Sequence, residues 1–120
     1  MIIERYFLLT GAVLATFGMC LGIVMGVRED FTLVPVHAHL NLVGWASLAL
    51  FGLAYAAGLA KKDGWAVLHY WLATSGAVIM PIGIYLALVS QQKLLAIVAS
   101  LLTLASMLLF IVNLWRARFR

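Results

Sequence analysis

Four long stretches of the sequence contain no charged side chain, and this feature limits the fold more than any other. A helix needs about 20 consecutive apolar residues to cross the hydrocarbon core of a membrane, which is roughly 30 Å thick. Residues 6–27, 35–60, 65–90 and 94–115 all reach that length. The connections between them are short, so neighbouring helices run antiparallel. The sequence therefore predicts an all-α, up-down bundle of four transmembrane helices, a single domain over residues 1–120.

The composition excludes most other classes of protein. Of the 120 residues, 66% are hydrophobic and 10% are charged, whereas a soluble domain is about half apolar and a quarter charged. A chain this short also leaves a large part of its surface in contact with solvent. These values exclude a soluble enzyme, a nucleic-acid-binding domain and a disordered tail. They favour a small membrane protein whose main partner is the lipid bilayer.

Basic residues lie unevenly on the two sides of the predicted membrane. Cytoplasmic loops carry an excess of Lys and Arg, and here the excess is on the side that holds both termini. Both termini are therefore expected in the cytoplasm. The basic residues on that side are Arg5, Lys61, Lys62, Arg116, Arg118 and Arg120, against Arg28 and Lys93 on the other.

Small residues line one side of the first predicted helix. Gly18, Gly22 and Gly26 form two overlapping GxxxG units, a pattern that lets helix backbones approach closely in a membrane. Three interpretations remain open. The glycines pack against neighbouring helices of the same chain, form a seam between copies of the chain, or leave room for a flat cofactor.

His37 and His39 lie in the first turns of the second predicted helix, just after Pro35. The helix N-terminus and an apolar setting both disfavour a charged imidazole, and a neutral imidazole can bind a metal. Positions i and i+2 of a helix are about 200° apart, so the rings cannot share one ion on a regular helix. Either the two histidines serve different cofactors, or the segment is locally irregular and both rings point the same way. Asn41 is expected to be the hydrogen-bond partner of His37. The competing interpretation is that both are polar residues bonded to backbone.

His69 opens the third predicted helix from the other side of the membrane, about 20 Å along the normal from His37 and His39. Together with Tyr70 and Trp71, it is expected to form part of an interfacial aromatic belt. A role in cofactor binding is the second interpretation of His69.

Two further groups of residues bear on function. Met19, Cys20 and Met25 lie near the level of His37, and soft sulfur with imidazole would suit Cu(I). The competing interpretation is that they fill gaps in packing.

A carboxylate relay within the predicted helices is missing, which argues against a proton pump that works as a single chain. The carboxylates outside them are Glu4, Glu29, Asp30 and Asp63.

The run VHAHLNLVGW (residues 36–45) resembles the His-x-His helix of haem–copper oxidase subunit I. It is still more similar to the version in bacterial nitric-oxide-response membrane proteins and small subunit-I-like proteins of that superfamily. The run LHYWLATSG (residues 68–76) is similar to a second segment of those small proteins. The resemblance covers about residues 36–90.

The resemblance implies a haem-b-binding protein of the bacterial cytoplasmic membrane, active in electron transfer or in gas or haem sensing. His37 and His39 become axial ligands of two different irons, and His69 and Asn41 become further cofactor-binding residues. This chain lacks the histidine cluster that binds copper in the oxidases, the tyrosine associated with it, and the carboxylate channels. Whether the protein is an enzyme is therefore left open. The oxidase subunit has twelve helices, and three copies of this chain would match them in a homotrimer. The alternatives are a copper- or zinc-handling membrane protein and a cofactor-free assembly partner of a respiratory complex.

Overall fold

The computed structural model describes residues 2–117. Its elements are α1 (Ile3–Arg28), α2 (Val34–His39), the π-helical segment η1 (Leu40–Ser47), α3 (Leu48–Ala56), α4 (Gly64–Ser90) and α5 (Leu94–Ala117). These residues form helices and connecting loops with no strand between them, which confirms the predicted all-α fold. Since α2, η1 and α3 follow one another without a break, they build one continuous rod.

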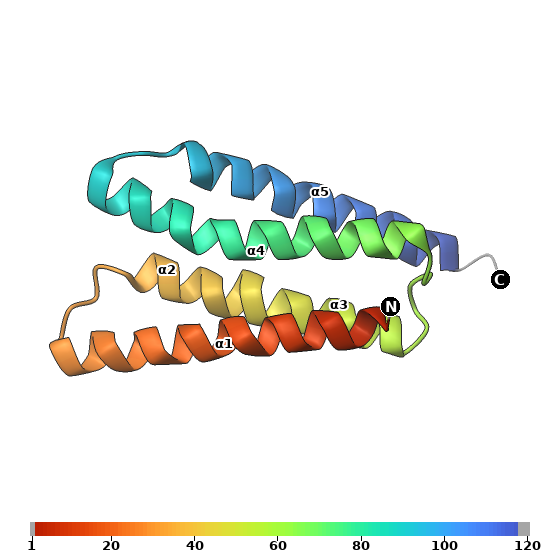
Figure 1. Ribbon diagram of the computed structural model, residues 1–120, viewed down its shortest axis with the longest axis horizontal. Coiled ribbons are helices and arrows are strands. Elements are labelled where there is room, and N and C mark those ends of the chain that lie inside the picture. The colour runs from red at the N-terminus through yellow and green to blue at the C-terminus, as the bar shows by residue number, and fades with distance from the viewer. Residues whose placement is uncertain (1, 118–120) are drawn as a thin grey trace.

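The helices form two antiparallel hairpins that lie side by side (Figure 1). The rod α2–η1–α3 pairs with α1, and α5 pairs with α4. The start of α1 and the end of α5 lie at the same end of the bundle, which we call the termini end. The four rods are long and apolar enough to cross a membrane. The predicted up-down bundle is therefore confirmed, and the protein is a multi-pass membrane protein.

The bounds of the rods lie within three residues of the sequence prediction, except at the end of α3. The prediction extended this helix to residue 60, but the helix ends at Ala56. The reason is Gly58, whose φ of 73° lies in the left-handed region that glycine adopts without steric cost. The next helix, α4, begins at an N-cap residue, Asp63, whose carboxylate accepts a hydrogen bond from the Trp65 N–H (3.0 Å).

Glycines lie where α4 and α5 approach most closely. A Cβ at Gly83 would overlap the backbone of Ala96, and a Cβ at Gly76 would come within 2.6 Å of the Thr103 hydroxyl. In lipid, helices associate through such close backbone contacts rather than through a hydrophobic driving force. The small residues of α4 therefore hold the second hairpin together.

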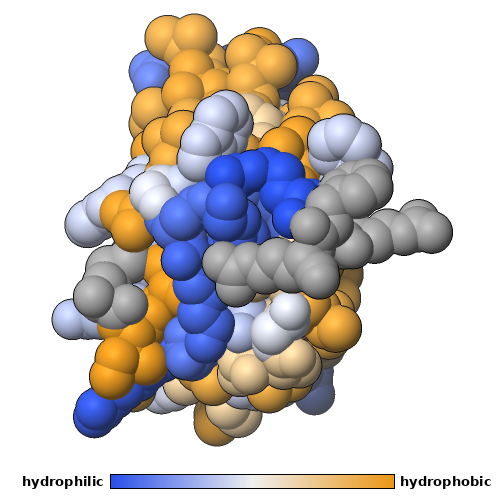
Figure 2. Space-filling view, turned by 90° about the vertical axis from the view of Figure 1, so that its right-hand side faces the viewer, coloured by the Kyte–Doolittle hydropathy of each residue, from blue (hydrophilic) through white to orange (hydrophobic). Residues whose placement is uncertain are grey.

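Charged side chains gather at the termini end, whereas the sides of the bundle are apolar. Figure 2 looks onto this end and shows a hydrophilic patch with hydrophobic residues around it. Two short ion pairs lie here, between Lys62 and Glu4 (2.8 Å) and between Arg116 and Asp63 (2.7 Å). Such a distribution fits a bundle whose sides contact lipid and whose end contacts water.

Candidate functional site

His37 lies in α2 and directs its ring toward α1. Its Nδ1 is 2.8 Å from the carbonyl oxygen of Gly18. Its Cε1 lies over Gly22, where a Cβ would come within 2.9 Å. The lack of a side chain at Gly22 therefore leaves the room that the half-buried imidazole occupies. Packing within one chain accounts for this glycine of the GxxxG run, whereas Gly26 has no atom within 4 Å of where its Cβ would stand.

His39 lies two residues later in the same α-helix. Its Nδ1 is 2.7 Å from the carbonyl oxygen of Pro35, one turn earlier, and its side chain is partly exposed. Because the irregular backbone begins only at Leu40, both histidines have regular helical geometry. They therefore face different sides of α2. This is the arrangement expected if each histidine serves a different cofactor.

The two rings have the same hydrogen-bond chemistry. A backbone carbonyl can only accept, so the Nδ1 atoms of His37 and His39 both carry a hydrogen and donate it. In the neutral ring, Nε2 then holds a lone pair. This is the form in which imidazole binds a metal, with the ring orientation fixed by the outer hydrogen bond. The bonds to backbone thus use one nitrogen of each ring, and the other has no hydrogen bond among residues 2–117.

Asn41 supports the backbone beside His37. Its Nδ2 donates to the carbonyl oxygen of His37 (2.8 Å), and its amide packs against Gly18. No hydrogen bond joins it to the His37 ring within residues 2–117, so its expected contact with the imidazole is instead one with the carbonyl. The bond reaches from η1, an eight-residue π-helical segment, back into α2. Such segments are rare and occur often at functional sites.

His69 is fully buried, so the prediction that it belongs to an interfacial belt is wrong. Its exposed fraction is 0%. The ring lies among Phe7, Phe51 and Phe110, with ring centroids 5.1, 4.6 and 5.3 Å away. Its Nδ1 is 3.0 Å from the hydroxyl oxygen of Tyr55.

The position of His69 on α4 explains its burial. Ala66 and Ala73, three residues before and four after it, are buried as well, and residues at this spacing share one helix face. That face of α4 points into the bundle. Trp71, two residues after His69, is 60% exposed and fits the expected belt. His69 lies in the second turn of α4, and α4 begins at the termini end, whereas α2 lies at the opposite end of the bundle (Figure 1). This arrangement agrees with the predicted separation in depth.

A chain of hydrogen bonds favours the tautomer of His69 in which Nδ1 accepts, because this direction gives the Tyr55 hydroxyl hydrogen an acceptor. Arg116 is only a donor, so its guanidinium donates to Oδ1 of Asn113 (3.4 Å). Asn113 then donates from Nδ2 to the Tyr55 oxygen (2.8 Å), and Tyr55 donates its hydroxyl hydrogen to Nδ1 of His69 (3.0 Å). With Nδ1 as the acceptor, Nε2 of the neutral ring carries a hydrogen. This buried N–H has no partner in the described part of the chain, and it offers no lone pair to a metal.

The Tyr55 hydroxyl is expected to contribute measurably to stability. Tyr55→Phe leaves the Asn113 amide and Nδ1 of His69 without their shared partner. Leaving buried polar groups unpaired costs about 1–3 kcal/mol, so unfolding in detergent should require correspondingly less denaturant. The matched control is Tyr85→Phe, because Tyr85 is 45% exposed on the side of the bundle. Equal changes in the two variants would contradict the proposed role of the chain of bonds.

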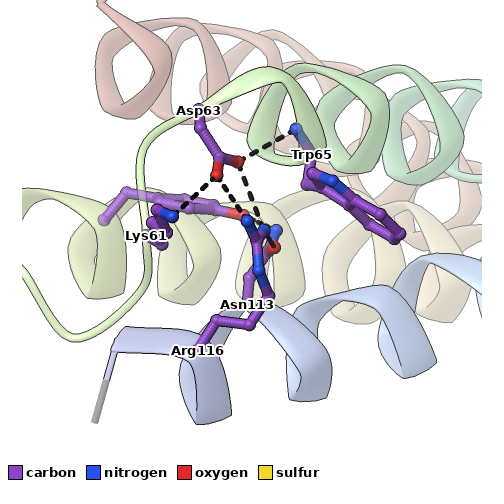
Figure 3. Close-up of polar contacts among 6 residues, drawn as sticks. Lys61, Asp63, Trp65, Asn113 and Arg116 are labelled. Atoms are coloured by element: carbon purple, nitrogen blue, oxygen red, sulfur yellow. Dashed lines mark hydrogen bonds and ion pairs between the residues drawn. The ribbon is translucent and has the colours of Figure 1, made fainter. Parts of the chain in front are cut away.

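Asp63 joins the loop before α4 to the end of α5 (Figure 3). Its carboxylate pairs with Arg116 (2.7 Å) and with Lys61 (3.5 Å). The Arg116 guanidinium also lies 5.3 Å from the centre of the Trp65 ring. Burial raises the pKa of the Asp63 carboxyl. This effect is outweighed by the hydrogen bonds from Arg116 and from the Trp65 N–H, and by the positive charges of Arg116 and Lys61. The pKa of Asp63 is therefore lower than its ordinary value.

This lowered pKa predicts a pH-dependent contribution of Asp63 to stability. The unfolded carboxyl titrates at about 3.9, so the stabilisation is complete above that pH and is lost as the pH falls through the lower folded-state pKa. Asp63→Asn keeps an N-cap acceptor but removes the charge. We expect this variant to lose up to about 1 kcal/mol at neutral pH and to approach the wild type as the medium becomes acidic. Thermal unfolding as a function of pH measures the difference, and a constant offset would contradict the expectation.

The sulfur residues of α1 bear on the soft-ligand copper site that the sequence left open. Cys20 is exposed, whereas Met25 is buried. Within residues 2–117, no three His, Cys, Asp or Glu side chains lie close enough together to hold a metal ion. These are imidazole, thiol and carboxylate groups and not thioethers, so copper binding that involves Met19 or Met25 stays a prediction.

Comparisons of the chain with protein-family models, with curated proteins and with solved structures found no match. The geometry of the histidines and the sequence pattern around them are therefore the basis for a functional proposal.

Proposed function

We propose that this membrane protein binds haem b and that His37 and His39 are axial ligands of two different haem irons. The observation that supports this most directly is the hydrogen-bonding state of the two rings. In each, Nδ1 donates to a backbone carbonyl, so the neutral ring keeps a lone pair on Nε2. Histidines that bind metals commonly have this arrangement, because the outer bond fixes the ring and raises its basicity. The resemblance of residues 36–45 to the His-x-His helix of haem–copper oxidases points to the same cofactor.

The small number of donor side chains favours haem over a bare metal ion. Zinc takes four protein ligands, or three and a water, and Cu(I) is selected by soft sulfur ligands. His, Cys, Asp and Glu side chains do not form a group of three within residues 2–117. A porphyrin brings four nitrogen ligands of its own, so one imidazole is enough to attach it. Copper or zinc binding is the alternative that metal analysis tests.

The residues around the histidines prepare them for ligation. The carbonyl groups of Gly18 and Pro35 orient the two rings, and Gly22 provides the space for His37. A bound haem would supply one-electron chemistry at iron and, where one axial position stays open, a binding position for a small gas. We therefore assign the protein to electron transfer or to gas or haem sensing.

The separate faces of His37 and His39 suggest that the sites involve more than one copy of the chain. Within one chain the two rings cannot meet on one iron, and His39 is partly exposed on the bundle. Three copies of a four-helix chain would equal the twelve helices of the oxidase subunit. We propose a homotrimer in the bacterial cytoplasmic membrane with both termini cytoplasmic, and a respiratory-chain protein as its electron partner.

An absorption spectrum with metal analysis tests the proposal. The protein is purified in mild detergent from haem-replete cells, and its iron, copper and zinc contents are measured on the same sample. The proposal predicts a Soret band and iron in a fixed ratio to the chain. A colourless protein that stays unchanged after addition of hemin would overturn it. Copper or zinc without iron would favour metal handling, and a metal-free protein that co-purifies with other subunits would favour an assembly partner.

A further inference from the structure

An apolar groove follows the seam between α1 and α4. It is a shallow, open depression of about 390 Å³, and large side chains along it are exposed, with Val13 at 55% and Phe17 at 63%. A hydrogen bond between Thr10 and Tyr70 (2.9 Å) links the two helices at its side. We call it the α1/α4 groove, and its lining residues are Leu9, Thr10, Val13, Leu14, Phe17 and Val78.

A second hollow, on the surface of α1, adjoins the α1/α4 groove on the side of the termini end. Leu9 also lines this hollow of about 470 Å³, together with Ile2, Arg5 and Tyr6. Arg5 therefore stands beyond the groove, on the side of the polar face of the bundle. From Arg5 to Phe17 the helix rises by about 18 Å, slightly more than one leaflet of the hydrocarbon core at roughly 15 Å.

Arg5 differs from the other basic side chains described at this end. Lys61 and Arg116 pair with Asp63, and Lys62 pairs with Glu4. Arg5 is exposed and has no carboxylate partner among residues 2–117. An unpaired cation at the mouth of an apolar groove complements a ligand with one anionic group and a long hydrocarbon chain.

We propose that the α1/α4 groove binds one anionic phospholipid, with an acyl chain along the groove and its phosphate against Arg5. The apolar lining suits an acyl chain, and Arg5 suits a phosphate. The rise from Arg5 to Phe17 is close to the thickness of one leaflet. Tyr6, which is 47% exposed beside Arg5, lies where aromatic residues contact lipid headgroups. This inference does not depend on haem binding.

Native mass spectrometry of the purified protein, titrated with phosphatidylglycerol or with phosphatidylcholine, tests the site. A basic residue near the membrane surface contributes about 1 kcal/mol to binding of anionic lipid, which corresponds to roughly a fivefold change in affinity. We expect one phosphatidylglycerol to bind about fivefold more tightly than phosphatidylcholine. Arg5→Gln should remove this preference. The control is Arg28→Gln, at the other end of the same helix, which should leave it unchanged.

Filling the groove provides a second variant. Val13→Trp places a large ring in the apolar part and should weaken both lipids while the helix content, checked by circular dichroism, stays that of the wild type. Equal affinity for the two lipids in the wild type, or equal losses in Arg5→Gln and Arg28→Gln, would show bulk lipid contact only and overturn the proposal. A second copy of the chain that excludes lipid from the groove would overturn it as well.

Discussion

The double variant His37→Ala, His39→Ala is expected to purify without bound haem. Both lone pairs that the structure leaves on Nε2 are lost in this variant, and a porphyrin held only by apolar contacts has no axial attachment. The rings face different sides of α2, so each single variant should keep about half of the haem per chain. The haem content is measured as the pyridine haemochromogen and divided by the protein concentration.

His69→Phe is the matched control for this loss. It removes a histidine from the same membrane protein, but one whose Nε2 carries a hydrogen, and it places a ring of similar size among Phe7, Phe51 and Phe110. We expect the control to keep the haem content of the wild type. Haem that survives in the double variant, or disappears in His69→Phe alone, would contradict the assignment of the ligands.

Gly83→Ala is expected to destabilise the hairpin of α4 and α5, although it adds only one methyl group. A Cβ at this position would overlap backbone atoms of Ala96, and a backbone cannot move aside as a flexible side chain can. Forcing extra methyl groups into a packed interface costs about 1–3 kcal/mol, which exceeds the gain of up to about 1 kcal/mol in helix propensity. Denaturant unfolding in detergent should therefore shift to lower concentration.

Gly26→Ala provides the comparison for this variant. It makes the same chemical change within a transmembrane helix, but the added Cβ meets no atom within 4 Å. We expect its stability to equal or slightly exceed that of the wild type. If both alanine variants unfold alike, the close approach of α4 and α5 is not what stabilises the hairpin.

The transmembrane fold could be predicted from the sequence because the bilayer leaves few alternatives. Uncharged stretches of sufficient length must become helices that satisfy their own backbone groups. The separate faces of His37 and His39 also followed from helix geometry, since α2 is regular at both residues. The end of α3 was missed because the left-handed turn at Gly58 stands within an otherwise apolar run.

The surroundings of His69 could not be predicted, because they depend on contacts between distant parts of the chain. Tyr55 and Asn113 are 58 residues apart yet share a hydrogen bond, and no local pattern joins them. Trp71 beside His69 favoured an interfacial position, but the face of α4 is decided by packing against other helices. The Gly18 carbonyl that orients His37 was missed for the same reason, since a backbone acceptor has no sequence signature.

Imidazole coordination of iron can be measured directly by electron–nuclear double resonance on ferric protein that contains ¹⁵N-labelled histidine. The proposal predicts a ¹⁵N coupling in the wild type and in His69→Phe, and its loss in the variant that lacks His37 and His39. A ferric haem signal without any ¹⁵N coupling, or protein that takes up no iron porphyrin at all, would contradict it.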